Sequence, residues 1–200
     1  LATSGTLTHW FRDVAARDLD PDTAFEKLAR EAEASPPGAG GLVVLPYFSG
    51  ERTPIHDANA KGVIFGMNLT HGRGDLYRAV LEGIACGTNH IIETYREIGH
   101  MPKKLLAVGG GTKNRIWSQA TSDVSGMSQS VCRKTLGASY GDAFLAALAM
   151  GDVSKTDILT WNPEERRIQP DKGTAKIYAR QYRQFKALYN RTKDLMAEPL

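Results

Sequence analysis

Three consecutive glycines at the end of an apolar run form the stretch of this sequence that is best suited to binding chemistry. Residues 105–108 are apolar, Gly109, Gly110 and Gly111 follow, and residues 112–117 have the spacing that begins a helix. This order predicts a strand, a tight turn and a helix N-terminus. Glycines let a flat ligand approach the main chain, and a first helical turn adds a positive pole. The turn is a candidate nucleotide site, and an ordinary strand-to-helix connection is the alternative.

A few acidic and sulfur-containing side chains are weaker candidates for chemistry. Asp75 and Glu82 could act as a general acid or base, but their positions on an expected helix favour capping and packing. Cys86 and Cys132 are far apart and lack metal-ligand spacing, so we expect two small buried residues. The sequence predicts no metal site built by this chain.

The composition is that of a globular protein with an ordinary core. The chain has 200 residues, of which 42% are hydrophobic and 24% charged, with a net charge of +3. No basic block alternates with aromatic residues, which argues against a nucleic-acid partner. No apolar run is long enough for a membrane span and no signal peptide opens the sequence, so we expect a cytoplasmic protein. The chain starts at Leu1 inside a small-residue stretch, which we interpret as a domain cut from a longer protein.

Hydrophobic periodicity predicts an α/β fold in which strands and helices alternate. Strands are expected at residues 42–46, 63–67, 105–108 and 128–132. Helices are expected from a first stretch capped by Thr6 or Thr8, and at residues 24–35, 74–99, 114–125, 137–149 and 174–197. The small-residue helix at 137–149 is expected to pack closely against the glycine turn or its neighbouring helix. Residues 160–171 are expected to be a polar connection.

Several stretches resemble the C-terminal domain of the FGGY family of carbohydrate kinases. Residues 62–67 (GVIFGM), followed after seven residues by 75–82 (DLYRAVLE), are similar to the family signature at each restricted position. Residues 45–54, the glycine turn with Trp117 and Gln119, and the helix at 137–149 resemble further family segments in the same order. The resemblance covers residues 1–152, and SGERTP at 49–54 is most similar to members that act on xylulose.

The resemblance implies an RNase H-like lobe of the actin-like ATPase superfamily, with a mixed sheet flanked by helices. Residues 1–200 would be the nucleotide-binding lobe of a two-lobe kinase that uses ATP and Mg²⁺. The catalytic base would lie in the N-terminal lobe, which is absent here, so no catalytic residue is expected and the isolated chain should be inactive. The expected reaction is phosphorylation of a ketopentose such as xylulose. A kinase for another pentulose or polyol, and a degenerate kinase acting as a regulator, remain alternatives.

A nuclease of the same fold is a further alternative that the sequence disfavours. Such an enzyme needs metal-binding carboxylates grouped at strand ends. The aspartates that could serve are not placed that way on the expected strands: Asp57, Asp75, Asp123 and Asp142.

The resemblance also implies which residues meet ligands. Nucleotide contacts are expected at six positions: Gly5, His9, Gly110, Gly111, Thr112 and Asn114. Asn114 would bond the base or ribose, with a helix N-cap as the alternative, and His9 is otherwise an ordinary surface histidine. Arg52 lies in a loop expected to face the cleft between lobes, where a cation can neutralise charge on the γ-phosphate. An ion pair with Glu51 or Asp57 is the other expectation for Arg52, and the one that the sequence favours. The implied partners are ATP, a small sugar, the N-terminal lobe and, for a homodimer, a second copy.

Overall fold

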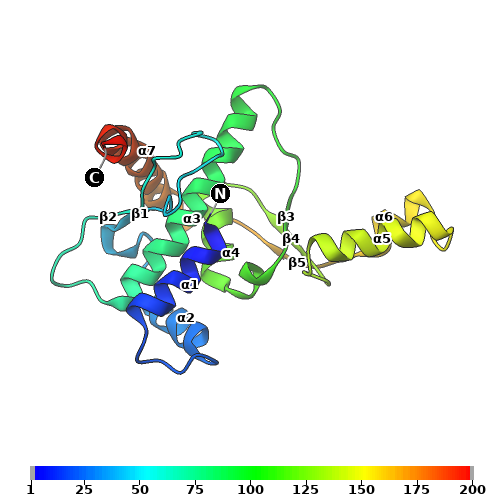
Figure 1. Ribbon diagram of the computed structural model, residues 1–200, viewed down its shortest axis with the longest axis horizontal. Coiled ribbons are helices and arrows are strands. Elements are labelled where there is room, and N and C mark those ends of the chain that lie inside the picture. Colours follow the sequence, from blue (N-terminus) through cyan, green and yellow to red (C-terminus); the bar gives the residue numbers. More distant parts are fainter. Residues whose placement is uncertain (1–2, 199–200) are drawn as a thin grey trace.

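A long central helix organises the chain, of which the computed structural model describes residues 3–198 (Figure 1). This helix is α3 (Arg73–Glu97), and four further helices pack against it: α1 (Ser4–Ala15), α2 (Ala24–Ala34), α4 (Arg115–Ser125) and α7 (Ala175–Ala197). Asp75, in the first turn of α3, caps the helix by accepting a hydrogen bond from Gly72 N at 2.9 Å. None of the described helices has the length and hydropathy needed to cross a lipid bilayer.

A short strand, β1 (Val43–Leu45), lies between α3 and α7 and is buried along its whole length. Val43 and Leu45 pack in one core cluster with residues of α7, while Val44 packs in the other with residues of α3. Since side chains of a strand alternate between its faces, one face packs on α3 and the other chiefly on α7, with Cys86 of α3 at its side. β1 pairs antiparallel with β2 (Val63–Phe65). The expected strand buried on both faces is confirmed.

A second sheet of three strands lies on the other side of α4 and has the order β3-β4-β5. β3 (Leu105–Ala107) runs parallel to β4 (Gln129–Cys132), and β5 (Glu164–Ile168) runs antiparallel to β4. The sheet is therefore mixed, and the predicted α/β class with helices flanking a mixed sheet is confirmed.

Two local expectations were wrong. Residues 160–171 are not only a polar connection, because they contain β5 and the end of a short helix, α6 (Ile158–Trp161). The first helix begins at Ser4, ahead of both Thr6 and Thr8. Thr3, which precedes it, donates its hydroxyl to Pro46 O at 2.6 Å and so ties the start of α1 to the segment after β1.

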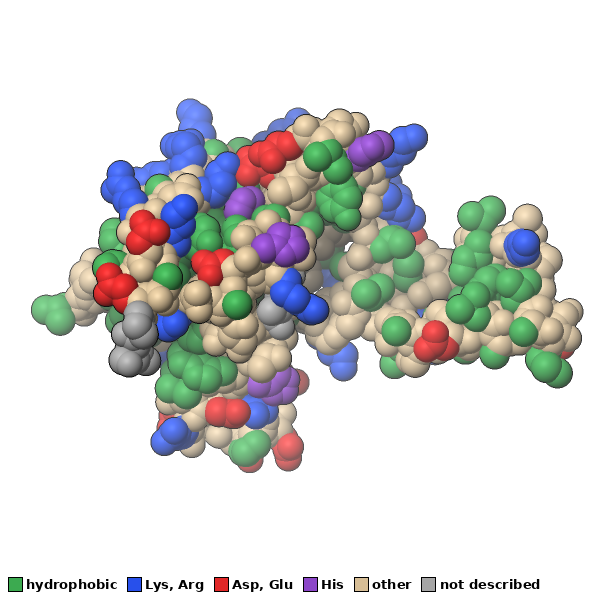
Figure 2. Space-filling model, turned by 45° about the horizontal axis from the view of Figure 1, so that its top comes forward, with side chains coloured by type: hydrophobic (Ala, Val, Ile, Leu, Met, Phe, Trp, Pro, Cys, Tyr) green, Lys and Arg blue, Asp and Glu red, His purple; other side chains and the backbone are tan. Residues whose placement is uncertain are grey.

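Helix α5 (Ala138–Met150) projects with α6 from the body of the molecule as an arm (Figure 1). Phe144 is its one buried residue and packs against Trp161, with ring centroids 5.3 Å apart. The expectation that this helix packs on the glycine turn or on α4 is wrong. Hydrophobic side chains cover much of the arm (Figure 2), and Leu145, Met150 and Leu159 are 61%, 79% and 82% exposed.

Candidate functional site at the glycine turn

The glycine turn joins β3 to α4 as expected, with one additional turn of 3₁₀ helix at Gly110–Lys113. Gly109 has φ 84° and ψ −177°, a conformation that residues with a Cβ rarely adopt. Its N–H donates to Thr135 O at 2.7 Å, which ties the turn to the segment after β4. The predicted order of strand, turn and helix N-terminus is confirmed.

Gly110 and Gly111 differ in what surrounds them. No atom lies within 4 Å of the position that a Cβ on Gly110 would occupy, so the main chain is open there. A Cβ on Gly111 would come within 2.8 Å of the Trp117 ring, so this glycine is needed for packing. The open surface of the turn is therefore the Gly110 peptide, and Gly111 allows Trp117 to lie beneath the turn.

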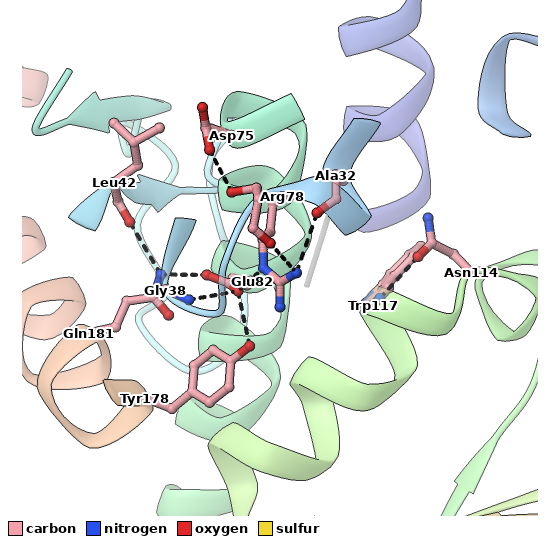
Figure 3. Close-up of polar contacts among 11 residues, drawn as sticks. Ala32, Gly38, Leu42, Asp75, Arg78, Glu82, Asn114, Trp117, Tyr178 and Gln181 are labelled. Carbon is pink, nitrogen blue, oxygen red and sulfur yellow. Dashed lines mark hydrogen bonds and ion pairs between the residues drawn. The ribbon is translucent and has the colours of Figure 1, made fainter. Parts of the chain in front are cut away.

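Thr112 and Asn114 hold the turn in shape. Thr112 is buried, and its hydroxyl donates to Gly109 O at 2.8 Å. Asn114 is the N-cap of α4, because its Oδ1 accepts from Trp117 N at 3.0 Å (Figure 3). Burial raises the pKa of Tyr77 to about 12, and a hydrogen bond with the Asn114 amide opposes that shift. Asn114 is thus a helix N-cap, which was the alternative expected from the sequence. At least one N–H of its side-chain amide remains to bond a ligand.

The first turns of α1 carry Gly5 and His9 on the surface. Both residues are exposed, and the space above Gly5 is open. The His9 ring meets the Phe25 ring edge-on, with centroids 5.0 Å apart. Leu7 and Phe11, on the buried side of α1, share a core cluster with Ile116 of α4. The structure therefore packs α1 and α4 around one core, in agreement with their adjacent ribbons in Figure 1.

Arg52 lies in the loop after β1 and has an exposed side chain. Among residues 3–198 it makes no ion pair, so the expected pairing with Glu51 or Asp57 is not found. The Asp57 carboxylate instead accepts from Tyr189 OH at 2.8 Å, and the Glu51 carboxylate accepts from Thr53 N at 3.1 Å. Arg52 is left facing solvent.

Asp75 and Glu82 have structural roles, as the sequence favoured. Asp75 accepts from Gly72 N and from Ser35 Oγ, and its pKa is lowered chiefly by the Ser35 hydrogen bond. Glu82 is completely buried and accepts from Arg78 Nε at 2.8 Å and Tyr178 OH at 2.9 Å (Figure 3). Both carboxylates are engaged by hydrogen bonds within the protein.

Two features of the structure could hardly be predicted from the sequence: the contacts of Arg78 and the backbone conformation of His56. Arg78 stands four residues before Glu82, a spacing that suits an ion pair on one helix, but its bonds to Ala32 O and Ser35 O depend on the tertiary fold. His56 has φ 49°, which a sequence does not reveal. The described residues also contain no cluster of three or more His, Cys, Asp or Glu side chains able to bind a metal ion.

The similarity to known proteins is concentrated in one family. The family model for the C-terminal domain of FGGY carbohydrate kinases matches residues 1–150. A xylulose kinase of Bacillus subtilis is 32% identical over 194 residues, which is 96% of this chain and 38% of that protein. The Escherichia coli xylulose kinase is 33% identical over 174 residues, 85% of this chain and 36% of that protein.

A solved structure gives the same result for the fold. The crystal structure of xylulose kinase from Rhodospirillum rubrum has a TM-score of 0.84 and 34% identity, over 97% of this chain and 39% of that one. The expected RNase H-like, actin-like ATPase lobe is thereby confirmed. The chain spans less than two fifths of the length of these relatives. It belongs to the FGGY family of carbohydrate kinases and corresponds to their C-terminal domain.

Proposed function

We propose that this chain is the nucleotide-binding half of a kinase that transfers the γ-phosphoryl group of ATP to a sugar hydroxyl. The similar proteins named above are xylulose kinases, which supports a ketopentose such as xylulose as the sugar. The rest of the kinase would supply the catalytic base and most of the sugar pocket. A cytoplasmic location fits this role and the two buried, unpaired cysteines.

The observation that carries this proposal is the open main chain at Gly110, in the turn that leads into α4. A flat base can lie against a peptide that carries no Cβ, and no atom lies within 4 Å of the position a Cβ would take there. The remaining Asn114 N–H would bond the base or ribose. Gly111 and Thr112 would keep the turn in shape, and Gly5 and His9 on α1 would border the same nucleotide. These residues fit a nucleoside.

The phosphates would extend from the turn into the cleft between this chain and the rest of the kinase. Mg²⁺, when bound with ATP, would supply positive charge that offsets the negative charge of the phosphates during transfer. Since the described residues form no carboxylate cluster, we propose that the metal is held by the nucleotide and by residues outside this chain. Closure of the two lobes would exclude water from the transferring group.

The reaction is tested with the complete kinase that carries this chain. A coupled assay of ADP release should show sugar-dependent turnover with one class of sugar when ketopentoses, aldopentoses and polyols are compared. Turnover with xylulose or ribulose confirms the ketopentose, while turnover with a polyol alone corrects the substrate class. Nucleotide binding without turnover on any sugar would contradict the kinase and favour a regulator.

The nucleotide site is tested by Gly110→Ala. The added methyl group occupies open space in the free protein, so the melting temperature should not change. It obstructs a base lying on the main chain, so we expect the KM for ATP to rise about tenfold, equivalent to about 1.4 kcal/mol. Steady-state kinetics at saturating sugar measure this change.

Gly111→Ala and Gly141→Ala are the matched variants. Gly111→Ala should lower the melting temperature, because the Cβ meets the Trp117 ring at 2.8 Å. Gly141→Ala, on the arm with nothing within 4 Å, should leave the KM for ATP unchanged. An unchanged KM for ATP in Gly110→Ala would contradict the assignment of the nucleotide site to this turn.

A further inference from the structure

The loop between β1 and β2 is polar and lies on the surface, yet it is firmly held. Glu51 and Asp57 exchange two backbone hydrogen bonds, of 2.9 and 2.8 Å, which close the loop between them. Gly50 has φ 68°, and a Cβ there would meet Ala58 O at 2.8 Å, so the two sides of the loop lie close together. Tyr189 OH of α7 bonds to Asp57 Oδ2 and anchors the loop to the body.

The acidic and basic side chains of this loop are used differently. The carboxylates of Glu51 and Asp57 accept hydrogen bonds from Thr53 N, Asn59 N and Tyr189 OH, which engage them within the protein. Within residues 3–198, the side chains of Ser49, Arg52 and His56 make no hydrogen bond or ion pair, and all three residues are exposed. The loop therefore offers solvent a guanidinium, an imidazole and a hydroxyl group.

His56 is held in a conformation that is unusual for a residue with a side chain. Its φ of 49° lies in the left-handed region, which is unfavourable for a non-glycine residue. The bond from His56 N to Arg52 O, at 3.1 Å, keeps the two residues together across the tip of the loop. Backbone strain of this kind persists where the surrounding structure fixes it, and it is frequent at ligand sites.

These three side chains surround one hollow. Ser49, Arg52 and His56 line a depression of about 320 Å³, together with Gly50, Glu51 and Ala58. Glu51 is 3% exposed, so its carboxylate presents little surface to the hollow. Arginine, histidine and serine donors arranged around one space suit a phosphate group, which accepts several charge-assisted hydrogen bonds.

We propose that the hollow formed by Ser49, Arg52 and His56 binds the phosphate group of a phosphorylated ligand. The loop that carries the hollow lies beside α1, because Thr3, which precedes α1, bonds to Pro46 O, and Trp10 of α1 packs on Phe48 with ring centroids 4.8 Å apart. Which phosphate occupies it, that of the sugar product or the γ-phosphate of ATP, rests on the proposed kinase function. The proposal that the hollow binds a phosphate group does not depend on that function.

The test is a titration of the 200-residue chain with inorganic phosphate in chloride buffer, followed by calorimetry and by NMR of the arginine Nε–H and histidine ring signals. Saturable binding that shifts the Arg52 and His56 signals is expected. Arg52→Ala should weaken phosphate binding about tenfold, because it removes charge-assisted hydrogen bonds to the phosphate. His56→Ala should weaken it less.

Arg183→Ala is the matched control, because Arg183 of α7 is exposed, makes no ion pair among residues 3–198, and changes the net charge equally when removed. It should leave phosphate affinity unchanged. Equal affinities in Arg52→Ala and Arg183→Ala, or no saturable binding, would overturn the proposal. Competition then identifies the source: a pentulose phosphate displaces inorganic phosphate if the sugar product occupies the hollow, and ATP does so if the γ-phosphate occupies it. If the complete kinase shows no turnover while phosphate still binds to the hollow, the proposed kinase function is contradicted and the phosphate site is not.

Discussion

Glu82→Ala is expected to destabilise the chain by about 3–5 kcal/mol, because it removes one partner of a buried ion pair. The Glu82 side chain has no exposed surface, and that of Arg78, its partner at 2.8 Å, is 11% exposed. Three further donors would lose their acceptor: Gly38 N, Tyr178 OH and Gln181 Nε2. Since Arg78 also bonds to Ala32 O and Ser35 O, the loss would loosen the end of α2, the turn after it and α7 together. Urea unfolding followed by circular dichroism measures the effect.

Two variants separate the causes of this loss. Asp13→Ala removes an exposed ion pair with Arg12, whose side chains are 58% and 27% exposed, and should cost about 1 kcal/mol or less. Glu82→Gln keeps the shape of the side chain and removes its charge. Its loss of stability should therefore lie between the losses in Asp13→Ala and Glu82→Ala. A loss below about 1 kcal/mol in Glu82→Ala would contradict the view that this carboxylate joins the helices.

Gly83→Ala is expected to lower the free energy of unfolding by about 2 kcal/mol, although alanine favours a helix by about 1 kcal/mol over glycine. The added Cβ would lie 2.5 Å from Val44 O, so α3 would have to move away from β1. Both faces of β1 are packed, one on α3 and one on α7, and the strand has little room to follow. Thermal and urea unfolding should agree on the loss.

Gly141→Ala is the control for this prediction. Gly141 also lies inside a helix, but no atom is within 4 Å of its Cβ position. Only the helix propensity remains, so stability should be unchanged or rise by roughly 0.5–1 kcal/mol. If Gly83→Ala behaves like Gly141→Ala, the close packing of α3 on β1 is not a constraint on this fold.

The elements with strong hydrophobic periodicity were predicted from the sequence. The strand at β1 was indicated by a continuous apolar run, and α3 by apolar residues at helical spacing that also carry the family signature. β5 could not be found in this way. Its sequence, EERRI, has four charged residues and almost no apolar alternation, and it is a strand because its backbone pairs with β4.

The candidate site was predicted in outline and less well in detail. Three glycines after an apolar run indicated the turn, but only the structure shows that Gly110 is open and Gly111 is packed on Trp117. The Arg52 ion pair was plausible from neighbouring charges, yet Glu51 and Asp57 bond elsewhere. His56 gave no signal, because a positive φ depends on how a loop closes.

The arm formed by α5 and α6 has a consequence for how the chain behaves in solution. Its apolar residues, Leu145, Met150 and Leu159 among them, face solvent rather than the core. Chaperones and hydrophobic dyes recognise such surfaces on incompletely folded proteins, and concentrated solutions of them aggregate. A chain with a well-packed body can therefore be poorly soluble, and its yield after expression would reflect the arm more than the stability of the core around α3.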